Sequence, residues 1–123
     1  MARTALDLSP EKLRSYHPDR ASEPPRASEK WEQAWEIART AAHLLRAQFG
    51  AKQVLAFGSL THRVWFTPWS DIDIAVRGIP AHQFYRAVAA VTGISPDFKV
   101  DVVDAEDCST SLRRIIEREG EIL

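Results

Sequence analysis

Apolar residues at alternate positions predict three β-strands in the central part of the chain. They are expected over residues 53–57, 71–77 and 98–103. In the second of these segments the apolar positions alternate with acidic ones, so that one side of the strand suits a core and the other suits solvent or a ligand.

Apolar residues spaced three and four apart predict helices around these strands. A long helix is expected over residues 29–49, with Ser28 as its N-cap and Gly50 as its C-terminal stop. Shorter helices are expected over residues 60–63, 81–91 and 110–119. We interpret the tryptophans of the long helix as core residues rather than as a partner surface.

The order of these elements predicts an α/β (α+β) fold, in which a small mixed sheet carries helices packed on one face and acids on the other. Breaks at prolines separate residues 1–27, an N-terminal arm or linker with a short helix near residues 10–16, from a single domain over residues 28–123.

The acidic side of the second strand carries Asp71 and Asp73, two positions apart. These like charges share a face and repel each other unless a cation lies between them. Mg²⁺ suits this position because it binds carboxylate oxygens and keeps sites for water and phosphate. Asp101 on the third strand joins the pair if the two strands are neighbours. Asp104 falls on the apolar face by alternation.

A Gly-Ser turn at Gly58 and Ser59 follows the first strand, and eleven residues separate it from Asp71. Glycine allows a close approach between backbone and ligand, and a hydroxyl with free N–H groups at a helix start suits a phosphate. The sequence therefore predicts phosphate binding beside the acids.

The Gly-Ser turn, the Asp-x-Asp pair and the later strand aspartate together resemble the DNA polymerase β-like nucleotidyltransferase superfamily. The short chain resembles its smallest members, the minimal nucleotidyltransferases that look like antitoxin partners of HEPN-domain toxins. The resemblance covers roughly residues 30–123. The segment between the turn and the Asp pair is one residue longer than is usual in that family.

This resemblance implies roles for the motif residues. Gly58 and Ser59 would contact the nucleotide phosphates, and Asp71 and Asp73 would bind two Mg²⁺ ions. Asp101 would bind the catalytic ion and help to activate the attacking hydroxyl. The closing segment of the chain, from the Asp101 strand onward, also looks like the end of a minimal nucleotidyltransferase.

The implied reaction is the transfer of NMP, with AMP from ATP as the expected case, to a hydroxyl. A tyrosine of a HEPN toxin is the expected acceptor, because 123 residues leave no room for a further acceptor-binding domain. Two alternatives stay open. One is an antitoxin that neutralises its partner by binding alone. The other is a small-molecule nucleotidyltransferase whose pocket would be built by a homo-oligomer.

Side chains near the acids allow both structural and functional interpretations. The aromatic segment 64–69 either stacks on the base, docks a protein acceptor, or folds back on the core. Arg77 and Lys99 either balance phosphate charge or pair with a carboxylate, and we favour pairing. The four histidines have no companions at metal spacing, so no zinc site is expected.

Composition adds few constraints. A hydrophobic content of 45% and a charged content of 27% are ordinary for a globular chain, and a net charge of −1 gives no basis for expecting nucleic acid binding. The single cysteine, Cys108, excludes an internal disulfide framework. No apolar run is long enough for a membrane span and no signal sequence is recognised, so we expect a cytoplasmic protein.

Overall fold

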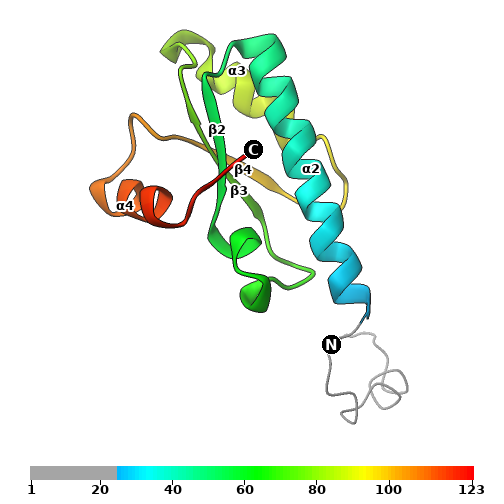
Figure 1. Ribbon diagram of the computed structural model, residues 1–123. Helices are drawn as coiled ribbons and strands as arrows, with labels where there is room; N and C mark the ends of the chain where they lie inside the picture. The colour runs from blue at the N-terminus through cyan, green and yellow to red at the C-terminus, as the bar shows by residue number, and fades with distance from the viewer. Residues whose placement is uncertain (1–24) are drawn as a thin grey trace.

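The computed structural model describes residues 25–123, with side chains from Ser28 onward. Its centre is a four-stranded sheet in the order β4-β3-β2-β5 (Figure 1). The strands are β2 (Gln53–Phe57), β3 (Ile72–Arg77), β4 (Val100–Asp104) and β5 (Glu121–Ile122). Because β2 pairs antiparallel with β3 and β5 while β3 pairs parallel with β4, the sheet is mixed. The predicted α/β (α+β) fold class is confirmed.

The long helix α2 (Pro25–Phe49) begins four residues before its predicted start. Ser28 therefore lies inside the helix and is not its N-cap, and its Oγ accepts a hydrogen bond of 2.7 Å from the Arg63 guanidinium. Pro25 suits the first turn of α2, because backbone N–H groups in a first turn have no partner within the helix and proline lacks this group. Gly50, with φ of 69°, follows the last helical residue as predicted. The short helix expected near residues 10–16 lies outside the described residues.

One face of the sheet packs against α2 and α3 (Ala81–Thr92) through a continuous apolar core. Each of the three long strands contributes fully buried aliphatic side chains, among them Val54, Ile74 and Val100. Trp31 and Trp35 of α2 are half-buried against the same core. The interpretation of these tryptophans as core residues is confirmed.

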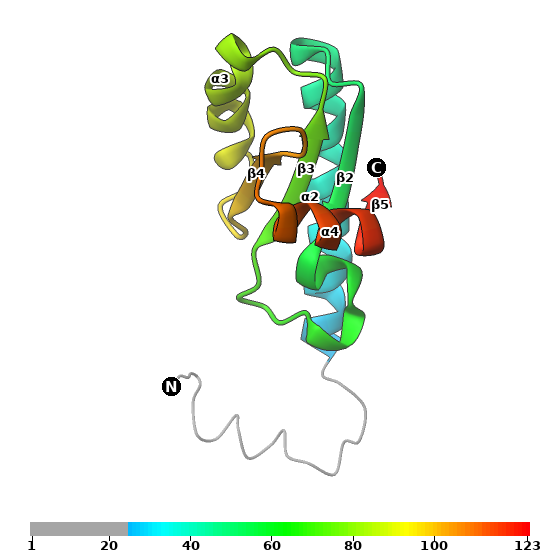
Figure 2. The same ribbon diagram turned by 90° about the vertical axis from the view of Figure 1, so that its left-hand side faces the viewer.

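The last helix, α4 (Thr110–Glu119), lies on the opposite face of the sheet from α2 (Figure 2). The prediction that all helices pack on one face is therefore wrong for α4. The physical reason is that the second face also has an apolar part, where Leu55 and Ala75 are buried against Ile116. The bounds of α4 agree with the prediction, and Gly120 follows its end.

Short elements differ most from the predictions. The expected helix over residues 60–63 is two 3₁₀ turns, η1 (Gly58–Thr61) and η2 (Arg63–Trp65). The edge strand β5 was not predicted. Among the described residues, no helix combines the length and the apolar character needed to cross a membrane.

Candidate functional site

Three strands bring the predicted acids together at one end of the sheet. The strand register places Asp73 of β3 between Phe57 of β2 and Asp101 of β4. Asp71 directly precedes β3 and lies two residues from Asp73, so it belongs to the same side. The structure therefore places Asp71, Asp73 and Asp101 on the face opposite to α2, as the alternation predicts.

The next row of side chains on this face is apolar. Leu55, Ala75 and Val103 pair across the same three strands and pack with Ile116 of α4. The acidic row is thus the first row beyond the small core under α4. Because they lie at the border of this small core, the three acids are partly buried but remain accessible to solvent.

Partial burial and mutual repulsion disfavour negative charge in this row. The pKa of Asp73 is raised to about 6, first because burial removes water from its carboxylate and then because Asp101 and Asp71 carry like charges. Lys99 Nζ lies 3.6 Å from Asp101 Oδ1, which bears out the expected carboxylate pairing. The side chains of Lys99 and Asp101 are 65% and 40% exposed, so water screens this ion pair and it offsets little of the repulsion.

Gly58 of the Gly-Ser turn lies against Asp73. Its φ of 76° is in the left-handed region, and a Cβ on it would stand 2.5 Å from Asp73 Oδ2. Both the backbone conformation and the space therefore require glycine. The turn is braced by Thr61, whose Oγ1 donates to the Gly58 carbonyl at 2.8 Å. The turn and the acids are thus neighbours in space, and Ser59 follows as the second residue of η1.

The donor set fits a divalent cation. Carboxylate oxygens are the ligands that Mg²⁺ prefers, and the raised pKa of Asp73 marks negative charge that a cation would stabilise. In the part of the chain that the structure describes, no three His, Cys, Asp or Glu side chains converge on one point that could hold a metal ion. Rotation of the carboxylates about their side-chain torsions is therefore needed before all three could bind the same ion.

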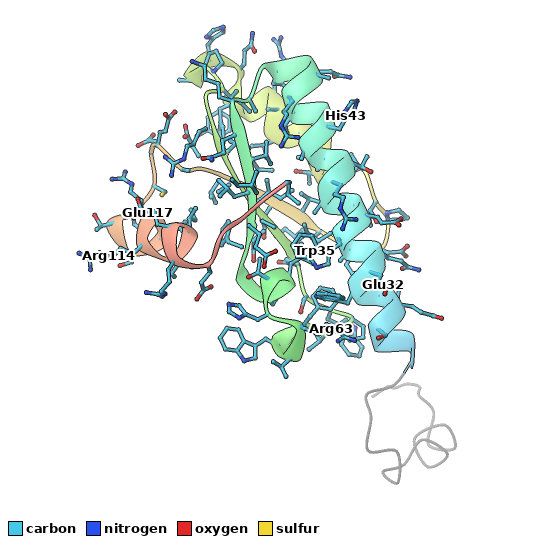
Figure 3. All side chains as sticks on the ribbon, viewed as in Figure 1. Glu32, Trp35, His43, Arg63, Arg114 and Glu117 are labelled. Atoms are coloured by element: carbon cyan, nitrogen blue, oxygen red, sulfur yellow. The ribbon has the colours of Figure 1, made fainter. Side chains whose placement is uncertain are left out.

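Two arginines, Arg77 and Arg63, have partners other than the acids. Arg77, at the far end of β3, donates from Nε to Gln53 Oε1 at 3.0 Å, so its observed partner is an amide rather than a carboxylate. Arg63 lies over the Trp31 ring, with 4.8 Å between its guanidinium carbon and the ring centroid. Figure 3 shows Arg63 at the end of the molecule where α2 begins.

The residues of the aromatic segment 64–69 do not all follow one interpretation. Phe66 folds into the core beside Phe98 and is 7% exposed. Val64, Trp65 and Trp69 are instead 89%, 62% and 86% exposed. Phe66 therefore folds back on the core, which is one of the three interpretations of this segment, whereas Trp65 and Trp69 do not.

A groove of about 550 Å³ lies away from the acids, and the sequence reasoning did not predict it. Its signal in the sequence is the i, i+4 spacing of Trp31, Trp35 and Arg39 on α2. Figure 3 shows Trp35 directed from α2 toward the sheet. The groove is lined by Trp31, Glu32, Trp35, Glu36, Arg39, Thr61, Arg63 and Glu121. No candidate site residue lines it, so we place the chemistry at the acidic row.

No protein-family model and no curated protein matches the chain. Solved structures do. A toxin–antitoxin with AMP-PNP is 25% identical, with a TM-score of 0.57 over 69% of this chain and 70% of that chain. A mutant of the toxin–antitoxin complex MntA–HpeT is 27% identical, with a TM-score of 0.56 over 69% of each chain.

A third structure is a tri-AMPylated Shewanella oneidensis HEPN toxin in complex with MNT antitoxin. It is 22% identical, with a TM-score of 0.54 over 72% of this chain and 70% of that chain. These neighbours confirm the resemblance inferred from the Gly-Ser and Asp-x-Asp motifs, and the chain has the fold of the MNT nucleotidyltransferase antitoxins.

Proposed function

We propose that this protein is a Mg²⁺-dependent nucleotidyltransferase that transfers AMP from ATP to a hydroxyl of a HEPN-type toxin and thereby acts as its antitoxin. The observation that carries the proposal is the row of Asp73 and Asp101, with Asp71 beside it, against the glycine of a Gly-Ser turn. Among the structural neighbours, one contains an AMPylated HEPN toxin and another contains AMP-PNP, which supports the choice of nucleotide and partner.

The Gly-Ser turn is proposed to bind the triphosphate. The left-handed backbone at Gly58, where η1 begins, would offer backbone N–H groups and the Ser59 hydroxyl to an anion. The absence of a side chain at Gly58 keeps the phosphates close to Asp73, which a Cβ would contact.

The acids are proposed to hold two Mg²⁺ ions, with Asp71 and Asp73 shared between both and Asp101 on one. Bound there, the ions would neutralise charge on the triphosphate and favour ionisation of the acceptor hydroxyl. Asp101, which lies at the outer side of the row on the edge strand β4, is proposed to accept the proton from that hydroxyl.

The proposed reaction is a single displacement at phosphorus. The acceptor oxygen forms an ester bond to the α-phosphorus of ATP, and the bond from that phosphorus to the α,β-bridging oxygen breaks. Pyrophosphate leaves with the bonding electrons, and the hydroxyl proton passes to Asp101 and then to water. Positioning and charge stabilisation carry this type of transfer.

The test is to incubate the full chain with ATP, Mg²⁺ and a HEPN-type candidate partner, and to measure the partner by mass spectrometry. We expect the partner to gain one or more AMP units and to lose toxicity. In the matched control, Asp71→Asn combined with Asp73→Asn keeps the shape of the side chains but removes the metal-binding charge. The control should transfer nothing.

Two results would overturn the proposal. If the double variant neutralises the partner as fully as the unmodified chain does, neutralisation is by binding alone. If the unmodified chain transfers nothing to the partner but adenylylates a small hydroxyl compound, the acceptor is a small molecule.

A further inference from the structure

The loop over residues 64–70, here called the aromatic loop, exposes three large apolar side chains within seven residues. Val64, Trp65 and Trp69 are three of the five large hydrophobic residues exposed in the described part of the chain. Single exposed apolar residues are ordinary, but three of them in one short loop are typical of a surface that contacts another molecule.

The aromatic loop is ordered by its own contacts, so the exposure is not that of a loose segment. Phe66 anchors it in the core beside Phe98. Ser70 Oγ accepts from the Thr67 backbone N–H at 2.9 Å, and the Ser70 N–H donates to the Thr67 carbonyl at 3.0 Å. Thr67 Oγ1 in turn accepts from the Trp69 N–H at 3.2 Å. A surface held in place before binding loses less entropy on binding.

The Trp65 ring is also oriented by its neighbours. It stacks on His62 with ring centroids 4.1 Å apart, and His62 Nε2 lies 3.1 Å from Glu119 Oε1 of α4. The indole therefore has a partner on the protein side and stays largely exposed to solvent on the other. This arrangement is typical of an aromatic anchor at an interface.

The aromatic loop borders the candidate site at both of its ends. Its first two residues belong to η2, which follows the Gly-Ser turn and η1, and its last residue, Ser70, directly precedes Asp71. The segment between β2 and β3 lies at the end of the sheet away from α3 (Figure 2). A molecule bound on this loop is thus held next to the acids.

We propose that the aromatic loop is the docking surface for the protein segment that presents the acceptor hydroxyl, an inference that rests on the proposed function. The loop contains no charged residue, so the matching segment is uncharged and apolar around its hydroxyl, as a tyrosine with apolar neighbours would be. Two tryptophans, which bury roughly 150–250 Å² each, offer more surface than one nucleotide base covers.

The test uses the full chain with Trp65→Ser and Trp69→Ser combined, and the HEPN-type protein used to test the proposed function. We expect the Kd of the complex, measured without ATP, to weaken at least about tenfold, because central tryptophans dominate interface affinity. The KM for the partner in AMP transfer should rise in parallel. The Kd for Mg²⁺-ATP and the Tm should stay unchanged.

The matched control is Tyr85→Ser, because Tyr85 is 82% exposed and lies on α3, away from the loop. It should leave partner affinity within about twofold of the unmodified chain. Weaker Mg²⁺-ATP binding with unchanged partner affinity would assign the loop to base stacking and overturn the proposal. Unchanged affinity for both, equal losses in the control, or no complex with the unmodified chain would overturn it as well.

Because complex formation is measured without ATP, the docking result does not depend on whether AMP is transferred. A tryptophan-dependent complex with no AMP transfer would refute the proposed function and keep the docking surface. AMP transfer by the tryptophan variant with an unchanged KM for the partner would keep the proposed function and refute the docking surface.

Discussion

The two faces of the sheet use the same three strands in opposite ways. On the face toward α2, Val54, Ile74 and Val100 are fully buried among apolar side chains, and this burial stabilises the fold. On the other face, Asp73 and Asp101 are neighbours, and burial raises the pKa of Asp73 instead of adding stability. Alternation along a strand therefore separates the residues that stabilise the protein from those proposed to do its chemistry.

The largest expected effect tests which face carries the chemistry. Asp101→Asn should lower AMP transfer about 10²–10⁴-fold, because an amide neither accepts the hydroxyl proton nor supplies the charge that binds Mg²⁺. Asp104 is the matched control, since it ends β4 on the other face and accepts from the Glu106 N–H at 2.9 Å. Asp104→Asn should transfer at nearly the unmodified rate. Initial rates with labelled ATP decide between them, and the reverse order would contradict the assignment of faces.

A substitution on the core face should lower stability and leave ligand binding unchanged. Leu45 of α2 is completely buried in the core, so Leu45→Ala should reduce the free energy of unfolding by about 2–5 kcal/mol. The fraction that stays folded should bind Mg²⁺-ATP with unchanged Kd. Urea denaturation and calorimetry at low temperature measure the two quantities. A large change in Kd for the folded protein would show that the faces are coupled.

The contact between the Gly-Ser turn and the acidic face is tested by Gly58→Ala. A Cβ there would meet Asp73 Oδ2 at 2.5 Å, and the positive φ adds strain, for a total cost of about 1–3 kcal/mol. Mg²⁺-ATP affinity should fall because the carboxylate must move. Gly50→Ala is the control: its φ of 69° brings similar strain with nothing within 4 Å. If both variants bind Mg²⁺-ATP equally well, contact with Asp73 has no role.

The sequence was sufficient where a local pattern decides the outcome. The bounds of β2 and α4 follow from apolar periodicity and from terminal residues such as Ser109, whose Oγ caps the Leu112 N–H at 3.1 Å. The pairing of Asp73 with Asp101 follows from alternation once β3 and β4 are neighbours. The position of each acid therefore needed only strand parity and one topological assumption.

Elements whose formation depends on residues far away in the chain could not be predicted from local sequence patterns. The two residues of β5 are too few for a period, and the strand exists because it pairs with Leu55 and Ala56. The side on which α4 packs depends on the buried Ala75, which in the sequence is only a small residue whose same-face neighbours, Asp73 and Arg77, are charged. The burial of Phe66 and the exposure of Trp65 likewise follow from the fold and not from residue type.

The smallest expected effect concerns the stability cost of the acidic face. The pKa of Asp73 rises from 3.8 to about 6 on folding. Well below pH 3.8 the carboxyl is protonated in both states and costs nothing. As pH rises from 3.8 to 6, the unfolded chain loses the proton first, so stability falls, and the full penalty stays at higher pH. Asparagine carries no charge at any pH and removes this penalty.

Asp73→Asn should therefore stabilise the metal-free protein near neutral pH by less than about 1 kcal/mol, since water screens a partly buried side chain. The gain should vanish at about pH 3, well below the pKa of the unfolded carboxyl. Urea denaturation in EDTA at both pH values measures it, and added Mg²⁺-ATP should reverse the order, because only the unmodified chain gains binding energy from the metal. A variant that is less stable than the unmodified chain at neutral pH would show that Asp73 supports the fold, and the separation between the two faces would fail at the residue on which the proposed chemistry depends.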